Sequence, residues 1–468
     1  MNYHDFIAGK LTAHQPTGID CDPSDITPLA KPFQRDVIRW AAKTGRAGMF
    51  MDCGLGKTLC ELEWARLIWT KNRDSKFLLL CPIAVAWQVL NEVRKFNMDL
   101  PARIVRNQDE CGTGVNITNY EKLHHFDTRQ FLGCILNEGS ILKGLGPVAK
   151  TLRESFAHTP YRLVETATPA PNDYMELGNH SEFLSVMNSV DMLSMFFVHD
   201  GGNTSQWRLR GHARGDFWKW MSSWSVAISR PSDIGHDDEG YDLPPMQMHE
   251  HVIDSRPMSG RLFSGGNISG TAIHGEKRAS LDGKCELVSG LVRSDGLWTI
   301  WVDTNYEADA LLKCIPDAID VRGSDSEDAK AEKLQSFTKG EVRILITKPE
   351  IGGFGLNWEH CHQTVYFAGF SFERWYQALR RHWRFGQTKS VQVHMVMSEN
   401  EQSVMDALRR KSAQAVEMTR EMSTNMKSGM MENLHGKRHG KSKYTPSRKL
   451  ELPRWIATGS GCAPASKW

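Results

Sequence analysis

The segment that most constrains this chain is Met-Asp-Cys-Gly-Leu-Gly-Lys-Thr, residues 51–58. Gly54 and Gly56 let the backbone turn tightly, so that its N–H groups can approach phosphate oxygens. Lys57 can reach the β- and γ-phosphates of a nucleotide, and the Thr58 hydroxyl can ligate Mg²⁺. The first glycine of the strict pattern is absent, because Met51 stands in its place. The segment therefore predicts a phosphate-binding loop with one departure from the standard pattern.

The residues around this loop predict alternating strands and helices. Ala47–Met51 is a short apolar strand candidate, and residues 59–70 have apolar positions at roughly helical spacing. Further candidates are strands at 77–81, 115–120, 131–136 and 162–164, and an amphipathic helix at 84–96. Such alternation after a phosphate loop predicts a parallel sheet with the nucleotide at its carboxyl edge. An acidic residue is then expected after the strand at 131–136, where Asn137 and Glu138 stand.

Composition is that of a globular protein with more than one domain. With 468 residues the chain is too long for one ordinary core, so two to three domains are expected. The longest apolar run, Phe77–Trp87, is broken by Pro82 and is too short to span a membrane. No signal-peptide pattern is present at the N-terminus, and the ten cysteines form no CxxC pair. We therefore expect a cytoplasmic protein with reduced thiols and no membrane association.

Charge is distributed unevenly along the chain. The net charge is +2, but from Ser423 onward nine Lys or Arg and two Glu give +7, which leaves −5 for residues 1–422. This tail is rich in Gly, Ser and Lys and is expected to be flexible. It suits loose contact with nucleic-acid phosphates, or it serves only to increase solubility. Any nucleic-acid groove on the acidic body must be a local basic patch.

Motifs in a fixed order carry a resemblance to a known family. Gln34, in Pro32-Phe33-Gln34-Arg35, matches a glutamine that the family uses near the adenine, and residues 51–58 match its motif I. The other matching segments are 81–96 (motif Ia), 117–123 (Ib), 137–143 (II), 166–172 (III), 298–304 (IV), 347–358 (V) and 377–387 (VI). Over roughly residues 30–410 the chain resembles superfamily 2 helicases and translocases of the Swi/Snf type, in the compact form found in phage and prophage genomes. Motif I of that family does not require the first Walker glycine.

The resemblance implies an α/β fold with two RecA-like domains, each a parallel sheet flanked by helices. The expected segments are a lead-in (1–29), lobe 1 (30–173), a helical insertion (174–242), lobe 2 (243–412), and a helix end with a flexible basic tail (413–468). The tryptophans of the insertion, at 207, 218, 220 and 224, are expected to pack in a core rather than to stack on bases.

The same resemblance assigns residues to the site, with ATP and Mg²⁺ as cofactors. Catalytic roles fall on Lys57, Glu138, Gln377, Arg381 and Arg384. Nucleotide contacts fall on Gln34, Gly54, Leu55, Gly56, Lys57, Thr58, Leu59 and Gly353, and metal contacts on Thr58, Asn137 and Glu138. Weaker candidates for nucleic-acid contact are Lys122, Thr166, Thr168, Thr347 and Lys348.

Motif VI needs arginines that face the phosphates. If Gln377–Phe385 is helical, Gln377, Arg381 and Arg384 fall on one face. An arginine near the γ-phosphate offsets transition-state charge, an effect worth roughly 10³–10⁵ in rate. Because the phosphate loop belongs to the first lobe, the site is complete only when the lobes close.

Motif II departs from the family pattern, which has Asp-Glu where this chain has Asn137-Glu138. The first carboxylate normally holds Mg²⁺ through water, and the second polarises the attacking water. Asn137 can still hydrogen-bond a metal-bound water but carries no charge. Either hydrolysis is reduced while nucleotide binding is kept, or the site tolerates the loss.

The resulting expectation is an ATP-dependent translocase on double-stranded DNA, acting in the cytoplasm, or in the host cytoplasm if a phage encodes it. Backbone contacts would make binding sequence-independent and sensitive to salt. Two alternatives stay open: a strand-separating helicase on DNA or RNA, and an ATP-gated DNA-binding clamp that does not hydrolyse ATP.

Overall fold

The computed structural model describes residues 14–434 except for 145, 172, 201–202, 255–274, 276, 353–355, 368 and 370. Of the predicted features, Gly353 and the basic tail beyond residue 434 lie outside this part of the chain. Within the described residues, no helix is long and apolar enough to cross a membrane.

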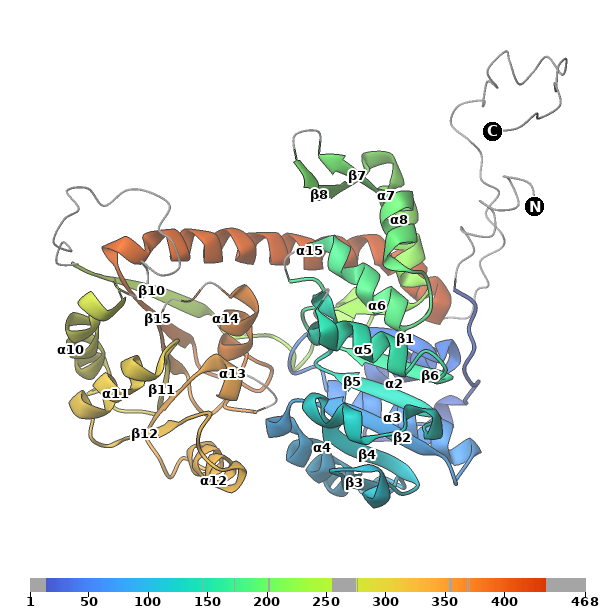
Figure 1. The fold of residues 1–468 in the computed structure, drawn as a ribbon, viewed down its shortest axis with the longest axis horizontal. Helices are drawn as coiled ribbons and strands as arrows, with labels where there is room; N and C mark the ends of the chain where they lie inside the picture. The colour runs from blue at the N-terminus through green and yellow to red at the C-terminus, as the bar shows by residue number, and fades with distance from the viewer. Residues whose placement is uncertain are drawn as a thin grey trace, which may run out of the picture.

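The first lobe is built on a parallel sheet (Figure 1). Its strands, in spatial order, are β3 (Ala102–Ile104), β4 (Gly114–Asn119), β2 (Lys76–Cys81), β5 (Gly133–Asn137), β6 (Tyr161–Glu165), β1 (Arg46–Met51) and β9 (Ser225–Ile228). All pair in parallel, so their carboxyl ends lie at one edge. Strand β6 lies between β1, which leads into the phosphate loop, and β5, which ends at Asn137. The strand after β5 in the chain therefore lies between the predicted phosphate loop and the motif II segment.

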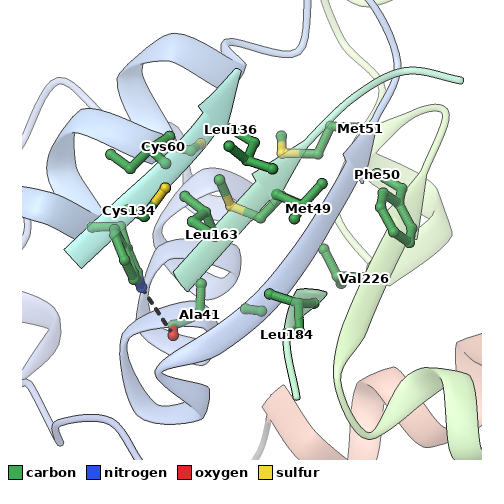
Figure 2. Packing of buried hydrophobic residues seen from close by; sticks show 14 of the residues in the cluster. Ala41, Met49, Phe50, Met51, Cys60, Cys134, Leu136, Leu163, Leu184 and Val226 are labelled. Atoms are coloured by element: carbon green, nitrogen blue, oxygen red, sulfur yellow. Dashed lines mark hydrogen bonds between the residues drawn. The ribbon is translucent and has the colours of Figure 1, made fainter. Parts of the chain in front are cut away.

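Helices and apolar side chains stabilise this sheet on its two faces. The helices that follow or precede its strands are α2 (Pro32–Thr44), α3 (Lys57–Lys71), α4 (Ile83–Lys95) and α5 (Pro147–Ser155). Figure 2 shows Met49 and Met51 of β1 on the same side of the sheet as Leu163 of the adjacent strand β6 and Leu136 of β5, while Phe50 points to the opposite side. Met49 and Met51 are fully buried, which stabilises the fold by roughly 1.5–3 kcal/mol per side chain. The strand that carries the phosphate loop is thus anchored by both faces of the sheet.

The second lobe contains another parallel sheet. Its strands, in spatial order, are β10 (Met246–Ile253), β15 (Val391–Ser398), β14 (Gln363–Phe367), β11 (Trp298–Trp301), β13 (Ile344–Thr347) and β12 (Ala318–Val321). Its helices are α10 (Leu281–Leu291), α11 (Asn305–Cys314), α12 (Glu327–Thr338), α13 (Pro349–Gly352) and α14 (Phe372–Leu379). The predicted fold of two RecA-like domains, each a parallel sheet flanked by helices, is therefore confirmed.

The segment between the lobes differs from the predicted helical insertion. It contains α6 (Leu177–Phe183), α7 (Ser189–Phe196), α8 (Arg214–Ser222) and an antiparallel hairpin of β7 (Phe197–Asp200) and β8 (Asn203–Leu209). Residues 225–228, expected within the insertion, form the edge strand β9 of the first sheet, because Val226 and Ile228 are apolar and bury against β1. Trp218, Trp220 and Trp224 are buried, as expected for core residues, and Trp207 packs against His199.

The C-terminal helix α15 (Gln402–Leu434) also departs from the expected boundaries. It starts in the second lobe and runs back along the first (Figure 1), where it contacts α8, β9 and α2. Its Met418, Met422 and Met426 lie in the core of the first lobe. These methionines are spaced four residues apart, which is the signal that a buried helix face leaves in the sequence. The chain beyond lobe 2 is therefore a bridge between the lobes before the basic tail begins.

Candidate functional site

The phosphate loop has the backbone geometry that its glycines predict. Gly54 and Gly56 have φ of +87° and +78°, a region that favours glycine. A Cβ on Gly56 would lie 2.2 Å from Nε2 of Gln34, which donates a hydrogen bond to the Leu55 carbonyl at 2.8 Å. Leu55 and Leu59 are buried beside the loop. Gln34 therefore fixes the loop from α2, and the loop leads directly into α3 at Lys57.

Lys57 lies among carboxylates at the carboxyl edge of the first sheet. Its Nζ is 3.9 Å from Oε1 of Glu165, the last residue of β6. Asn137 donates from Nδ2 to Oε1 of Glu61 at 2.8 Å and to Oε2 of Glu165 at 3.5 Å. Glu61 lies one helical turn after Lys57 on α3, and its side chain is fully buried. The predicted lysine and the motif II asparagine thus meet around two glutamates that the motifs did not indicate.

Burial and mutual repulsion govern the protonation of this cluster. Burial, partly opposed by the Lys57 ammonium, raises the pKa of Glu165 to about 7. Burial and the Glu165 carboxylate raise the pKa of Glu61 well above its usual range. Burial alone would lower the pKa of Lys57, but Cys53, Glu165 and Glu138 together raise it above the ordinary value. The lysine is therefore held as a cation, and a proton remains on the Glu61–Glu165 pair near neutral pH.

The cluster suits a hard divalent cation. Glu138, at the end of β5, is 8% exposed, and its Oε2 has no hydrogen-bond partner among the described residues. Its backbone is left-handed, with φ of 58°, which is uncommon for a residue other than glycine. Carboxylate, hydroxyl and carbonyl oxygens are the ligands Mg²⁺ prefers. Among the described residues, no group of three or more His, Cys, Asp or Glu side chains could hold a metal ion by itself. Thr58 and Glu138 are therefore suited to Mg²⁺ that is held jointly with a nucleotide's phosphates.

The predicted arginines of the second lobe are held inside that lobe. Arg381 donates to Gln377 Oε1 at 2.9 Å and to the Leu356 carbonyl at 3.0 Å. Arg384 donates to the same carbonyl at 3.2 Å, and its Nε is buried without a partner among the described residues. Burial and the neighbouring Arg381 lower the pKa of Arg384 to about 10. Gln377, Arg381 and Arg384 are thus brought together, but the two arginines bind the Leu356 carbonyl rather than the phosphate loop.

The expected helix over Gln377–Phe385 ends earlier than predicted, because α14 stops at Leu379. Beyond that point the chain is held by tertiary anchors. The Nδ1 of His382 is 3.2 Å from the Cys361 carbonyl, and its Nε2 is 2.9 Å from the Thr299 hydroxyl. The indole of Trp383 donates to the Pro244 carbonyl at 2.7 Å. These contacts override helical continuation, so Arg381 and Arg384 share an acceptor and not a helix face.

A different pair from α14 and its end reaches the phosphate loop. Arg380 forms an ion pair with Asp52 at 2.9 Å and donates to the Cys53 carbonyl at 3.0 Å. The Tyr376 hydroxyl donates to the same Asp52 carboxylate at 2.6 Å. Asp52 raises the pKa of Arg380 despite full burial, so its charge is kept. The lobes are therefore joined at the loop itself.

Two further contacts join the lobes near this point. Lys143, the last residue of the motif II segment, forms an ion pair with Glu373 of α14. Phe385 packs against the core of the first lobe, and a Cβ on Gly54 would lie 2.8 Å from its ring. Gly54 is thus required both by its backbone angle and by the close approach of the second lobe.

The predicted nucleic-acid residues have different environments. Thr166 is fully buried and accepts from the Thr168 backbone N–H at 3.1 Å. Thr347 is also buried, with its hydroxyl donating to the Val321 carbonyl at 3.2 Å. Thr168 is 8% exposed, whereas Lys122 and Lys348 are half-buried. In this arrangement the two lysines are the members of the set that can present charge to phosphates.

Sequence reasoning missed Glu61, Glu165 and Arg380. Glu165 directly follows the buried strand residues Leu163 and Val164, and Glu61 stands among apolar residues of α3. An acidic residue within or at the end of a buried apolar run is the available signal. Tyr376 stands four residues before Arg380, but nothing in the sequence indicates that either residue contacts Asp52.

Comparisons with known proteins find similarity among solved structures but not among sequences. No protein-family model matches the sequence, and no curated protein matches it. A solved structure of the SWI2/SNF2 ATPase core of Sulfolobus solfataricus in complex with dsDNA is similar at 16% identity and a TM-score of 0.42, covering 88% of this chain and 98% of that chain. The RecA-like assignment accordingly depends on the strand order and register of this chain.

Proposed function

We propose that this chain is a DNA-dependent ATPase of the Swi/Snf type that couples ATP hydrolysis to movement along double-stranded DNA. The observation that carries the proposal is the position of Lys57, which starts α3 at the carboxyl edge of one parallel sheet, next to a second RecA-like lobe. Motif VI of the second lobe meets the phosphate loop through Arg380 and Asp52. A nucleotide bound at the loop would therefore act on the contact between the lobes.

Named residues would divide the chemistry. Lys57 and the loop N–H groups would hold the phosphates, with Gln34 fixing the loop through the Leu55 carbonyl. Thr58 and Glu138 would hold Mg²⁺, which when bound neutralises phosphate charge. Glu138 would orient the attacking water with its unpaired Oε2. Arg381 and Arg384 would leave the Leu356 carbonyl for the γ-phosphate, offsetting charge that develops in the transition state.

The order and identity of the motifs are what support movement along duplex DNA. A strand-separating helicase is the second candidate, because the same motifs serve that activity. The two activities differ in what they displace. A translocase would remove the third strand from a triplex-bearing duplex and leave a forked duplex paired, while a helicase would open the fork.

The primary test is phosphate release with double-stranded DNA, single-stranded DNA or RNA added in turn. We expect stimulation by duplex DNA that weakens as salt rises. Lys57→Ala serves as the inactive control, and Lys71→Ala, an exposed lysine at the end of the same helix, as the matched active control. ATP binding and DNA binding without phosphate release under any condition would favour the ATP-gated clamp instead.

A further inference from the structure

The first lobe carries more buried carboxylates beside the phosphate loop than the motifs account for. Asn137 and Glu165 are direct partners in the parallel register of β5 and β6. Paired residues on adjacent strands project their side chains to the same face of a sheet. Because β6 lies between β5 and β1, Glu165 stands between motif II and the phosphate loop. It is the strand-end carboxylate paired in register with Asn137, the residue at the position of the missing motif II aspartate.

Contacts of Glu165 point toward the nucleotide position. Oε1 lies 3.9 Å from Nζ of Lys57, the group expected to reach the β- and γ-phosphates. Oε2 lies 3.5 Å from the Asn137 amide, so the two oxygens face the lysine and motif II respectively. The side chain is 1% exposed, and its carboxylate is enclosed with the lysine rather than turned to solvent. The residue therefore bridges the two motifs that share the cation.

An amide at position 137 is compatible with this arrangement where a carboxylate is not. Asn137 uses its N–H groups as donors toward Glu61 at 2.8 Å and Glu165 at 3.5 Å. An aspartate would replace these donors with acceptors and bring a third carboxylate against two others. Asn137 is thus matched to its acidic neighbours.

An unpaired acceptor is a second indication of a ligand at this strand end. Oε2 of Glu138 is buried and has no hydrogen-bond partner within the described part of the chain. Glu138 is 92% buried beside the same strand end, and its backbone is held in the left-handed region. A buried carboxylate oxygen without a donor can be completed by an ion or a water. The Glu138 carboxylate is therefore available to a cation at this strand end.

We propose that Glu165 supplies the magnesium-site carboxylate that motif II lacks. The carboxylate then comes from the end of β6 and not from the end of β5, where Asn137 stands. Asn137 and Glu61 are positioning residues that orient the Glu165 carboxylate. The inference rests on the proposed nucleotide binding and names the residue that holds its cation. It also predicts that Asn137 does not by itself impair the site. The competing explanation is that Glu165 only neutralises Lys57 when no nucleotide is bound.

The test measures how Mg²⁺ changes the affinity for a fluorescent, non-hydrolysable ATP analogue, with EDTA as the metal-free arm. Glu165→Gln is expected to bind the analogue in EDTA at least as well as the unaltered chain. It should lose the gain in affinity that Mg²⁺ confers, by roughly 10- to 100-fold. Mn²⁺ electron paramagnetic resonance on the same samples reports the metal directly. Glu63→Gln, which alters an equally buried carboxylate of α3 that pairs with Arg66, is the matched control and should keep the Mg²⁺ effect.

A charge exchange separates a metal ligand from a structural counter-ion. The proposal expects Asn137→Asp alone to gain no Mg²⁺ affinity, and Asn137→Asp combined with Glu165→Gln to regain most of what Glu165→Gln lost. An unchanged Mg²⁺ effect in Glu165→Gln overturns the inference, as does tighter Mg²⁺-dependent binding in Asn137→Asp alone. The measurement on Asn137→Asp alone tests the inference even if Glu165→Gln fails to fold. Failure of the unaltered chain to bind the analogue in either arm would instead sink the proposed function.

Discussion

The two lobes contribute opposite charges to the site and hold them in different ways. In the first lobe, Glu165 lies 3.9 Å from Lys57 at the end of β6, and Glu138, directly after β5, acts on the same lysine. Glu61, on the helix after the loop, is joined to Asn137. In the second lobe the charges are arginines at and beyond the end of α14. Strand ends are fixed by the sheet itself, whereas residues 380–387 are held by individual hydrogen bonds. The first-lobe side of the site, which we call the acidic half, is thus preformed. The second-lobe arginines, which we call the basic half, can be rearranged.

This difference indicates how a nucleotide would join the halves. Arg381 and Arg384 now share the Leu356 carbonyl, an acceptor that a phosphate can replace because a charged acceptor binds guanidinium more strongly. Arg380 already crosses to Asp52. We infer that the arginines have two roles. Arg380 holds the two lobes together, and Arg381 and Arg384 bind the phosphates when a nucleotide is present.

The largest expected effect tests the basic half. Replacing both Arg381 and Arg384 by Ala should lower the rate constant of hydrolysis by roughly 10³–10⁵, because transition-state charge is no longer offset. Nucleotide affinity should change far less, since Lys57 remains. Steady-state ATPase assays and equilibrium binding separate the two quantities, with Arg410→Ala, an exposed arginine of α15, as control. Equal losses in binding and turnover would contradict the division between the lobes.

The next effect tests the acidic half. Lys57→Ala should reduce both nucleotide affinity and turnover, by roughly 10²–10³ in turnover, since the cation facing the phosphates is lost. The variant also leaves Glu165 without its 3.9 Å partner. Isothermal titration with an ATP analogue and a phosphate-release assay would measure the two losses. Turnover lost with affinity unchanged would show that the lysine does not hold the phosphates in the ground state.

A smaller effect concerns the contact that joins the halves. Asp52→Asn leaves the fully buried Arg380 guanidinium without its carboxylate, which should weaken docking of the lobes by roughly 3 kcal/mol. Energy transfer between dyes on the two lobes would report a larger mean separation. Asp74→Asn, which changes an exposed acidic residue of the same lobe, should leave the separation unaltered. If Asp52→Asn behaves like this control, Arg380 is not the docking residue.

The smallest expected effect is on the pH dependence of stability in the second lobe. Burial lowers the pKa of His382 to about 3, below the unfolded value near 6.5. Between these values the unfolded chain binds a proton that the folded chain does not, so stability is present above pH 6.5 and falls as pH decreases. At pH 5 we expect a loss of about 1–2 kcal/mol from this residue.

Denaturant unfolding at pH 7 and pH 5 measures that loss. His382→Gln should show a shallower decline between the two pH values, even if it is less stable at pH 7. The same decline in both proteins would mean that His382 does not set the acid sensitivity of the lobe.

Much of the fold was predictable because its signals are local. The apolar runs that end at Met51, Cys81 and Leu136 each form a buried strand, and the phosphate-loop glycines have the positive φ that their positions demand. These patterns predicted one parallel sheet, and the family resemblance implied the second. It did not indicate β9 as an edge strand or α15 as a bridge, because whether an apolar segment pairs with β1 or packs on α8 depends on distant partners.

The site divides in the same way. Lys57, Glu138 and the arginines of motif VI are recognisable from residues adjacent in the chain. Asn137 seemed a defect when considered alone, since its partners Glu61 and Glu165 are 76 and 28 residues away in the chain.

By itself, the sequence determined that the chain forms alternating strands and helices around a phosphate loop, since periodicity and turn residues act over a few positions. Only the tertiary structure decided which charges meet. The order of strands places Glu165 between the loop and Asn137, and docking of the lobes brings Tyr376 to Asp52 across 324 positions. Electrostatic and hydrogen-bond energies depend on distance in space, and spacing along the chain does not fix that distance once the chain has folded.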